Sequence, residues 1–194
     1  TPSETIGDII AKSDRVYQEI KPDALLIYGD TNSCLTVISA KKRKIPIFHM
    51  EAGNRCFDLR VPEESNRKIV DHLSDINLPL SEHARNYLLA EGIKPETVIK
   101  IGSPMMEVLN ANMKKINSSN VLETEGLKVQ GYILISIHRE ENVDSEKNFS
   151  DFLDSIDEIS KVYNLPIIIS THPRTRKKLE VIGYEKSNKL IRFS

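Results

Sequence analysis

Residues Phe48–Arg67 read F-H-M-E-A-G-N-R-C-F-D-L-R-V-P-E-E-S-N-R, and this stretch is the strongest guide to both fold and chemistry. It continues from the apolar run Ile45–Phe48, which predicts a buried strand, and it is dense in carboxylate, guanidinium and imidazole side chains. Ligands of open α/β sheets bind beyond the carboxyl ends of the strands. So many charges after a strand therefore favour a site for acid–base chemistry on a polar, anionic substrate. The alternative is an ordinary solvated loop with surface ion pairs.

Composition narrows the class of protein. The chain has 194 residues, of which 39% are hydrophobic and 28% charged, as in a globular protein of one large or two small domains. Its net charge of −1 gives no reason to expect nucleic acid as a partner. Cys34 and Cys56 fit no disulfide or metal spacing, so we interpret them as reduced thiols in a cytoplasmic protein. No apolar run approaches the roughly 20 residues of a membrane span, and we expect no membrane partner.

Apolar and amphipathic segments alternate in a strand–helix rhythm, which predicts an α/β fold with parallel sheets. We expect parts of two such domains, the C-terminal part of the first in residues 1–112 and the N-terminal part of the second in residues 131–194, with a polar linker region over 113–130. Neither G-x-G-x-x-G nor a P-loop motif occurs, so a nicotinamide enzyme or a P-loop nucleotidase is disfavoured. The predicted strands are 23–28, 45–48, 76–80, 98–101, 132–137, 166–170 and 190–193; the predicted helices are 3–20, 33–43, 62–73, 81–91 and 146–163.

Three carboxylates follow two strands that we expect to be neighbours: Asp30, Glu51 and Glu63. Clustered carboxylates raise at least one pKa, which suits proton transfer near neutral pH. Two of these residues also have a structural interpretation. Asp30 could cap the helix predicted from Ser33, and Glu63 could complement the start of its helix and pair with Arg67.

The histidines differ in their predicted positions. His49 and His138 lie at the carboxyl ends of strands and are the best candidates for function. His72 and His83 fall within helical patterns and are better explained as structural. His172 either lines the site or belongs to a turn before a proline. No two histidines have metal-ligand spacing on a helix face, so we assign no metal, and no G-x-S-x-G elbow suggests a nucleophile.

Five motifs taken together resemble a known family. Y-G-D-T-N-S at 28–33, H-M-E-A-G-N-R at 49–55, P-E-E-S-N-R at 62–67, G-S-P at 102–104 and I-H-R-E-E-N at 137–142 occur in this order. They are similar to motifs of the non-hydrolysing UDP-N-acetylglucosamine 2-epimerases. The resemblance implies a glycosyltransferase-B-like fold, with a UDP-sugar bound between two Rossmann-like domains. It also implies inversion of carbon 2 without a cofactor, through elimination of UDP to a 2-acetamidoglucal and re-addition.

The resemblance also implies roles for individual residues. Asp30, Glu51 and Glu63 match the catalytic carboxylates, and His138 matches the catalytic histidine of the second domain. We expect the substrate to be bound by Arg67, His49, Arg55, Arg139, Glu140 and His172. The full-length protein is expected to be a cytoplasmic homodimer that serves cell-surface polysaccharide synthesis.

Two departures from the family pattern qualify these expectations. The segment between Gly53 and Pro62 differs from the usual form and looks more like a branch that makes UDP-N-acetyl-L-fucosamine from UDP-2-acetamido-2,6-dideoxy-L-talose. The family's basic N-terminal motif and its later nucleotide-gripping motif have no match, so we expect a central fragment that is inactive alone. A glycosyltransferase of the same architecture and a non-enzymatic sugar-nucleotide sensor are the alternatives of other classes.

Overall fold

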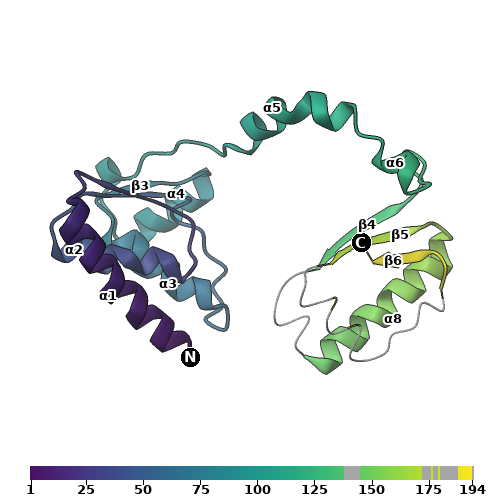
Figure 1. Ribbon diagram of the computed structural model, residues 1–194, viewed down its shortest axis with the longest axis horizontal. Helices are drawn as coiled ribbons and strands as arrows, with labels where there is room; N and C mark the ends of the chain where they lie inside the picture. Colours follow the sequence, from purple (N-terminus) through teal and green to yellow (C-terminus); the bar gives the residue numbers. More distant parts are fainter. Residues whose placement is uncertain (138–144, 172–175, 177–178, 180–187, 194) are drawn as a thin grey trace. The chain divides into compact units, whose positions relative to one another are not determined.

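The computed structural model describes residues 1–137, 145–171, 176, 179 and 188–193 (Figure 1). These residues form two compact units, Thr1–Ala111 (unit 1) and Asn112–Ser194 (unit 2), each built on a three-stranded parallel sheet. The predicted α/β fold with parallel sheets is confirmed. The elements of unit 1 are α1 (Pro2–Ile20), β1 (Leu25–Tyr28), η1 (Asn32–Thr36), α2 (Val37–Lys42), β2 (Ile47–Met50), α3 (Pro62–Leu73), β3 (Ile76–Leu78), α4 (Glu82–Ala90) and η2 (Pro95–Thr97). Then follow α5 (Met105–Asn117), α6 (Val121–Thr124), β4 (Ile133–Ile137), α8 (Glu146–Tyr163), β5 (Ile167–Thr171) and β6 (Ile191–Phe193).

The sheet of unit 1 has the order β1-β2-β3. Tyr28 lies opposite Met50, and Met50 lies opposite Leu78, so the last residues of the strands are level with one another. All strands run in the same direction, and their carboxyl ends therefore meet at one edge of the sheet. The segments that begin at Gly29 and Glu51 leave the sheet side by side at this edge.

Helices α1, α2 and α3 share one hydrophobic core with one face of this sheet, as the left part of Figure 1 shows. Ile27 of β1 and Ile47 of β2 point into that core and meet Val37 of α2 and Val70 of α3. Side chains of a strand alternate between its two faces. The other face of β1 carries Leu26, which is 61% exposed. The apolar run at 23–28 predicted a buried strand, whereas the described residues cover only one face of β1.

Several predicted bounds need correction. The first strand begins at Leu25 rather than at residue 23, and the third ends at Leu78 rather than at residue 80. The second strand begins two residues later than predicted, because Ile45 still donates its backbone N–H to Ala40 at the end of α2 and Pro46 has no N–H to give. The predicted strand 98–101 is reduced to one bridge, between Val98 and Asn77. The predicted helix 33–43 starts as a 3₁₀ turn, η1, before it becomes α2.

In unit 2, the parallel sheet β4-β5-β6 packs against α8, whose predicted bounds 146–163 are confirmed. Phe149, Leu153 and Ile156 are spaced about one helical turn apart, so they form one apolar stripe. They pack on Ile167 and Ile169 of β5.

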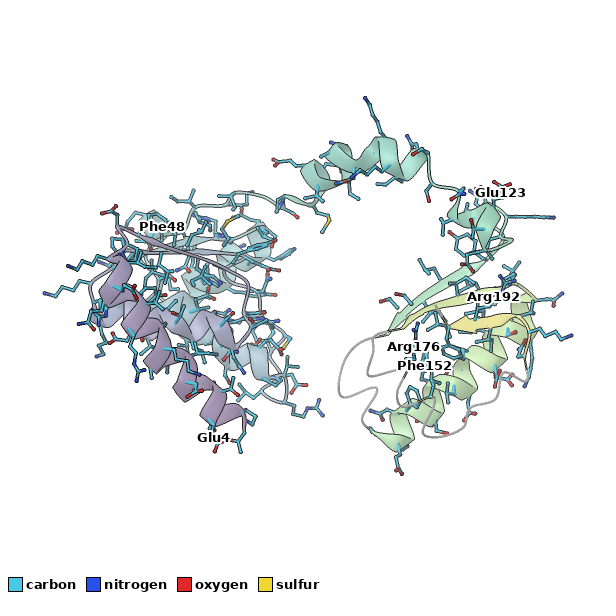
Figure 2. All side chains as sticks on the ribbon, in the orientation of Figure 1. Glu4, Phe48, Glu123, Phe152, Arg176 and Arg192 are labelled. Atoms are coloured by element: carbon cyan, nitrogen blue, oxygen red, sulfur yellow. The ribbon has the colours of Figure 1, made fainter. Side chains whose placement is uncertain are left out.

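The polar stretch before β4 is partly helical rather than an extended linker. It contains α6 and the last part of α5, and the division between the two units falls within α5. The guanidinium of Arg192 on β6 donates to the backbone carbonyl of Glu125, the residue after α6. Figure 2 labels Arg192 on its strand and Glu123 in α6. This bond attaches the end of the polar stretch to the sheet of unit 2.

Gly53 gives a stability prediction for unit 1. Its φ is +80°, and an added β-carbon would lie 2.3 Å from the carbonyl oxygen of Ala84 on α4. We expect Gly53→Ala to destabilise the full-length protein by about 2 kcal/mol or more, since backbone and helix must both shift. Gly7 on α1 is the matched control: nothing lies within 4 Å of its added β-carbon. Gly7→Ala should be neutral or stabilising, and urea unfolding of both variants checks the contrast. Equal midpoints would contradict it.

Candidate functional site

Asp30 and Glu51 are adjacent at the carboxyl edge of the unit 1 sheet. They follow β1 and β2, whose final residues are cross-strand partners. A β-carbon placed on Gly29 would lie 3.8 Å from Oε2 of Glu51, so the Glu51 carboxylate reaches the backbone directly before Asp30. The structure thus places two of the three acidic residues that the sequence proposed as catalytic, Asp30 and Glu51, on neighbouring segments of this edge.

The backbone of Glu51 is in the left-handed region, with φ of 68°. This conformation is uncommon for a residue with a long side chain and persists only where the surroundings enforce it. Its carboxylate accepts a hydrogen bond from the side-chain amide of Asn54, at 3.3 Å. Strained residues of this kind are frequent in active sites, which supports a functional role at this position.

Helix α3 holds Asp30 in place. The Arg67 guanidinium donates from Nε to Oδ2 of Asp30 at 2.7 Å, and the Asn66 amide donates to the Asp30 carbonyl at 3.0 Å. The helix-cap interpretation of Asp30 is wrong, because η1 begins after Thr31 and receives no side-chain cap. Burial opposes the charge of Arg67, but its bond to Asp30 raises the pKa of the guanidinium above its ordinary value.

Glu63 lies half-buried in the first turn of α3, one turn before Arg67. The proposed pairing between these two residues is not the one observed, since Arg67 binds Asp30 and, at 3.2 Å, Glu64. Glu63 and Glu64 both lie at a helix N-terminus, where the helix dipole favours an ionised carboxylate by about 0.3–1 kcal/mol.

Glu64 closes the loop between β2 and α3. Its side chain is fully buried and accepts the backbone N–H groups of Cys56 at 3.0 Å and of Phe57 at 3.2 Å. Burial raises the cost of its charge, yet these bonds, with Arg67, hold the pKa of the Glu64 carboxyl below its ordinary value. Glu64 therefore fixes the path of the loop.

His49 and Arg55 occupy positions that the sequence did not predict. His49 lies within β2, 1% exposed, and contacts the carboxylate of Asp71 on α3 through Nδ1 at 2.7 Å. The buried Arg55 side chain donates to Asp71 at 2.8 Å and binds Glu91 through both Nε and Nη2. Both residues were expected to contact substrate, but their polar atoms are engaged inside the protein.

Cys34 and His72 are two further titratable side chains of unit 1. Burial, with the nearby charges of Asp30 and Asp71, raises the pKa of the Cys34 thiol to about 12, so this thiol stays protonated at neutral pH. His72 is exposed and contacts Glu91 at 3.3 Å. In the described part of the chain, no group of three histidine, cysteine or acidic side chains is arranged to hold a metal.

Four predicted site residues, His138, Arg139, Glu140 and His172, lie outside the described residues. Four further residues had no assigned role in the sequence analysis, yet their side chains hydrogen-bond to the predicted site residues or to the loop that carries them: Glu64, Asn66, Asp71 and Glu91. Glu64 and Asn66 lie within the motif P-E-E-S-N-R, so their closeness to Glu63 in the sequence could have marked them as candidate residues of the site. Asp71 and Glu91 carry no such signal, because only the packing of α3 and α4 brings them to the loop.

Chemically, the edge combines two adjacent carboxylates with a guanidinium. Carboxylates at such a position can take a proton from a substrate carbon and return one, while Arg67 supplies positive charge beside them.

A sequence model described as UDP-N-acetylglucosamine 2-epimerase matches residues 1–193, and all these side chains lie within the match. The chain belongs to the UDP-N-acetylglucosamine 2-epimerase family. The resemblance noted from the motifs is confirmed.

Relatives in this epimerase family include proteins named for different sugars. The UDP-N-acetylglucosamine 2-epimerase of Methanocaldococcus jannaschii is 34% identical over all of this chain and 55% of its own length. The UDP-2,3-diacetamido-2,3-dideoxy-D-glucuronate 2-epimerase of Pseudomonas aeruginosa is 31% identical over 98% of this chain and 53% of its own length. The chain thus spans about half the length of these curated relatives.

Solved epimerase structures show the same fold. The structure of UDP-N-acetylglucosamine 2-epimerase from Rickettsia bellii matches with a TM-score of 0.90 and 54% identity, over 98% of this chain and 50% of that one. The M. jannaschii enzyme in complex with UDP-GlcNAc and UDP matches with a TM-score of 0.89 and 34% identity, over all of this chain and 55% of that one. These epimerases have the glycosyltransferase-B-like fold that the motifs implied. Of the helices described here, none is both long and apolar enough to cross a bilayer.

Glu64 gives a prediction on stability and its pH dependence. We expect Glu64→Gln to destabilise the full-length epimerase-family protein by about 1–3 kcal/mol at pH 7, because an amide N–H₂ would face backbone donors. The folded-state pKa of Glu64 is lowered, so its contribution is complete above the ordinary value of 4.5 and is lost as the pH falls through the folded-state pKa. Urea midpoints of wild type and variant should therefore converge toward low pH.

Glu82→Gln is the matched control, since Glu82 lies in the first turn of α4 as Glu64 lies in the first turn of α3, but Glu82 is exposed. Its surface ion pairs should change the midpoint little at either pH. A Glu64→Gln variant as stable as wild type at pH 7 would contradict the assigned role of Glu64.

Proposed function

We propose that the full-length protein inverts carbon 2 of a UDP-activated N-acetylhexosamine. The observation that carries this proposal is the adjacency of Asp30 and Glu51 at the carboxyl edge of a parallel sheet, with Arg67 bound to one of them. Family membership supports it, as does the similarity to the M. jannaschii epimerase, whose structure holds UDP-GlcNAc and UDP.

The proposed reaction has two halves. A carboxylate takes the proton from carbon 2, the electron pair of that bond forms a carbon 1–carbon 2 double bond, and the bond from carbon 1 to UDP oxygen breaks. UDP departs with its electron pair and leaves a 2-acetamidoglucal. A second acid, which starts protonated, then gives its proton to carbon 2 from the other face, and UDP adds again at carbon 1. The first acid releases its proton to water and the second takes one up, so both return to their starting states. No oxidant or reductant is needed, because the bonds broken in the first half are formed again in the second.

This chemistry explains the need for more than one acidic side chain. The proton leaves one face of the sugar and returns to the opposite face, so a single carboxylate on one side cannot serve both halves. We assign proton transfer to Asp30, Glu51 and Glu63. Arg67 keeps Asp30 in position. His138 is assigned to the departing UDP, with Arg139, Glu140 and His172 as further substrate contacts.

The sugar is proposed as UDP-N-acetylglucosamine or its 2-epimer, and UDP-2-acetamido-2,6-dideoxy-L-talose is the alternative. The diversity of sugars in the relatives' names makes a panel test necessary. Proton NMR in deuterated water with each UDP-sugar alone would show which carbon 2 proton exchanges with solvent. Exchange without an acceptor separates an epimerase from a glycosyltransferase. We further infer a cytoplasmic homodimer that supplies cell-surface polysaccharide synthesis.

The carboxylates give the first test of this function. We expect Asp30→Asn, Glu51→Gln and Glu63→Gln each to lower turnover of the full-length enzyme about 100-fold or more, the usual scale for positioned acid–base groups. The matched control is Asp75→Asn: Asp75 accepts the N–H of Ile47 at the start of β2, at the opposite end of the same sheet. Its turnover should stay near that of wild type. Near-normal turnover in all three site variants would refute the assignment.

His138 gives a second, separate test. We expect His138→Ala to weaken UDP binding and slow elimination, because a cation or donor that meets the leaving diphosphate would be lost. Isothermal titration with UDP and turnover measurements check this, with His83→Ala as a control because His83 is an exposed residue of α4. Wild-type UDP affinity and wild-type turnover in His138→Ala would remove His138 from the site.

A further inference from the structure

We propose that His49 is a positioning residue that holds Asp30 and Glu51 in register from inside the sheet. The inference rests on the proposed epimerase function, since it concerns the geometry of the two carboxylates. It assigns His49 a role different from the substrate contact expected from the sequence.

The two ring nitrogens of His49 reach two different segments. Nε2 lies 3.1 Å from the carbonyl oxygen of Gly29, the residue before Asp30. A carbonyl oxygen can only accept, so Nε2 donates. Nδ1 lies 2.7 Å from Oδ1 of Asp71. One ring therefore connects the end of β1 with helix α3.

Asp71 passes this connection on to the segment after Glu51. Its second oxygen, Oδ2, accepts the backbone N–H of Gly53 at 3.1 Å and Nη1 of Arg55 at 2.8 Å. Glu51 is thus held on both sides, by His49 two residues earlier and by Gly53 two residues later. This double anchorage accounts for the left-handed backbone of Glu51, which needs such support.

Arg55 extends the same network to α4. It binds Glu91 through Nε at 2.7 Å and Nη2 at 2.6 Å, a bidentate geometry that fixes the guanidinium plane. Burial opposes the charge of Arg55, but Glu91 and Asp71 raise the pKa of its guanidinium above its ordinary value. The buried charges are therefore paired, and each bond restrains the loop that carries Glu51.

Direct action of His49 on a substrate does not fit this geometry. The side chain is 1% exposed, and both of its nitrogens already contact protein atoms. A role in simple core packing remains the competing explanation. The two explanations predict different effects of substituting His49. If His49 positions the carboxylates, a substitution lowers the catalytic rate through Asp30 and Glu51. If His49 only packs in the core, a substitution lowers the stability and leaves the rate unchanged.

Two substitutions separate the two contacts of the His49 ring, one with Gly29 and one with Asp71. The amide nitrogen of glutamine lies near the place of Nε2, so His49→Gln keeps a donor for Gly29 and loses the Asp71 contact. Asparagine places its amide nitrogen near Nδ1, so His49→Asn keeps the Asp71 contact and loses the bond to Gly29. We expect each variant of the full-length enzyme to lower kcat about 10- to 100-fold, with KM for the UDP-sugar within about twofold of wild type.

Double-mutant cycles measure the coupling in kcat between His49 and each carboxylate, and a purely structural role of His49 would produce no such coupling. His49→Gln should cost less than about threefold in kcat when Glu51→Gln is already present, because the carboxylate that it misplaces is gone. His49→Asn should likewise cost little in the Asp30→Asn background. The control is Val37→Ala, a core substitution away from the network, which should lower the melting temperature with kcat unchanged.

The outcomes are distinguishable. Full additivity in both cycles, or a lower melting temperature with unchanged kcat, overturns the positioning role. If the His49 variants do not fold, Asp71→Asn replaces them in the cycle with Glu51→Gln, since it keeps the shape of the side chain, and the same criteria apply. A wild-type protein that exchanges no carbon 2 proton in deuterated water overturns the proposed function itself.

Discussion

Parallel pairing between β1 and β2 is the constraint on which the candidate site depends. Because Tyr28 lies opposite Met50, the chain leaves both strands at the same level, and Asp30 and Glu51 become neighbours. A slip of one residue would turn every side chain of β2 to the other face of the sheet. His49 would then point away from Asp71, and Ile47 would leave the core that it shares with Val70. The hydrophobic core and the acidic edge thus enforce the same register.

Helix α3 fixes the path of the loop after β2 through two buried acidic side chains. Glu64 and Asp71 are seven residues apart and therefore lie on the same face of the helix. Both are fully buried against the loop that follows β2, and Arg67 lies between them. A buried carboxylate without partners is strongly destabilising, by about 3–5 kcal/mol when one partner of a pair is removed. The loop can therefore adopt only the path that brings its N–H groups and Arg55 to these two acids.

Sequence periodicity predicted the elements whose burial repeats regularly. The bounds of α3 and α8 were predicted correctly: Pro62 occupies the first position of α3, and an apolar stripe runs along α8. The strand that contains His49 was displaced by two residues, because Ile45 and Pro46 are apolar but complete the turn after α2. Periodicity reports which residues prefer burial, and it does not report which backbone groups are already bonded.

In the candidate site, too, some features were predictable from the sequence and others depend on tertiary packing. The sequence indicated that Asp30 and Glu51 meet, because each follows a strand and parallel strands end at one edge. It could not indicate that His49 and Arg55 turn inward. Their partners, Asp71 and Glu91, lie on α3 and α4, and only tertiary packing of these helices brings the partners to the loop. A charged side chain in a motif is therefore consistent with either chemistry or support until its partners are known.

Hydrogen-bond partners divide the acids of this edge into two kinds. Asp71 and Glu64 are fully buried, and backbone N–H groups and guanidinium groups occupy their oxygens, so a substrate has no access to them. Asp30 keeps 26% of its side-chain surface exposed although Arg67 binds it. Neighbouring Glu63 and Glu64 differ in the same way, because consecutive residues of a helix point about 100° apart. Glu64 turns toward the loop backbone, and Glu63 stays half-buried. The motif P-E-E-S-N-R thus combines a supporting acid and a candidate catalytic acid in adjacent positions.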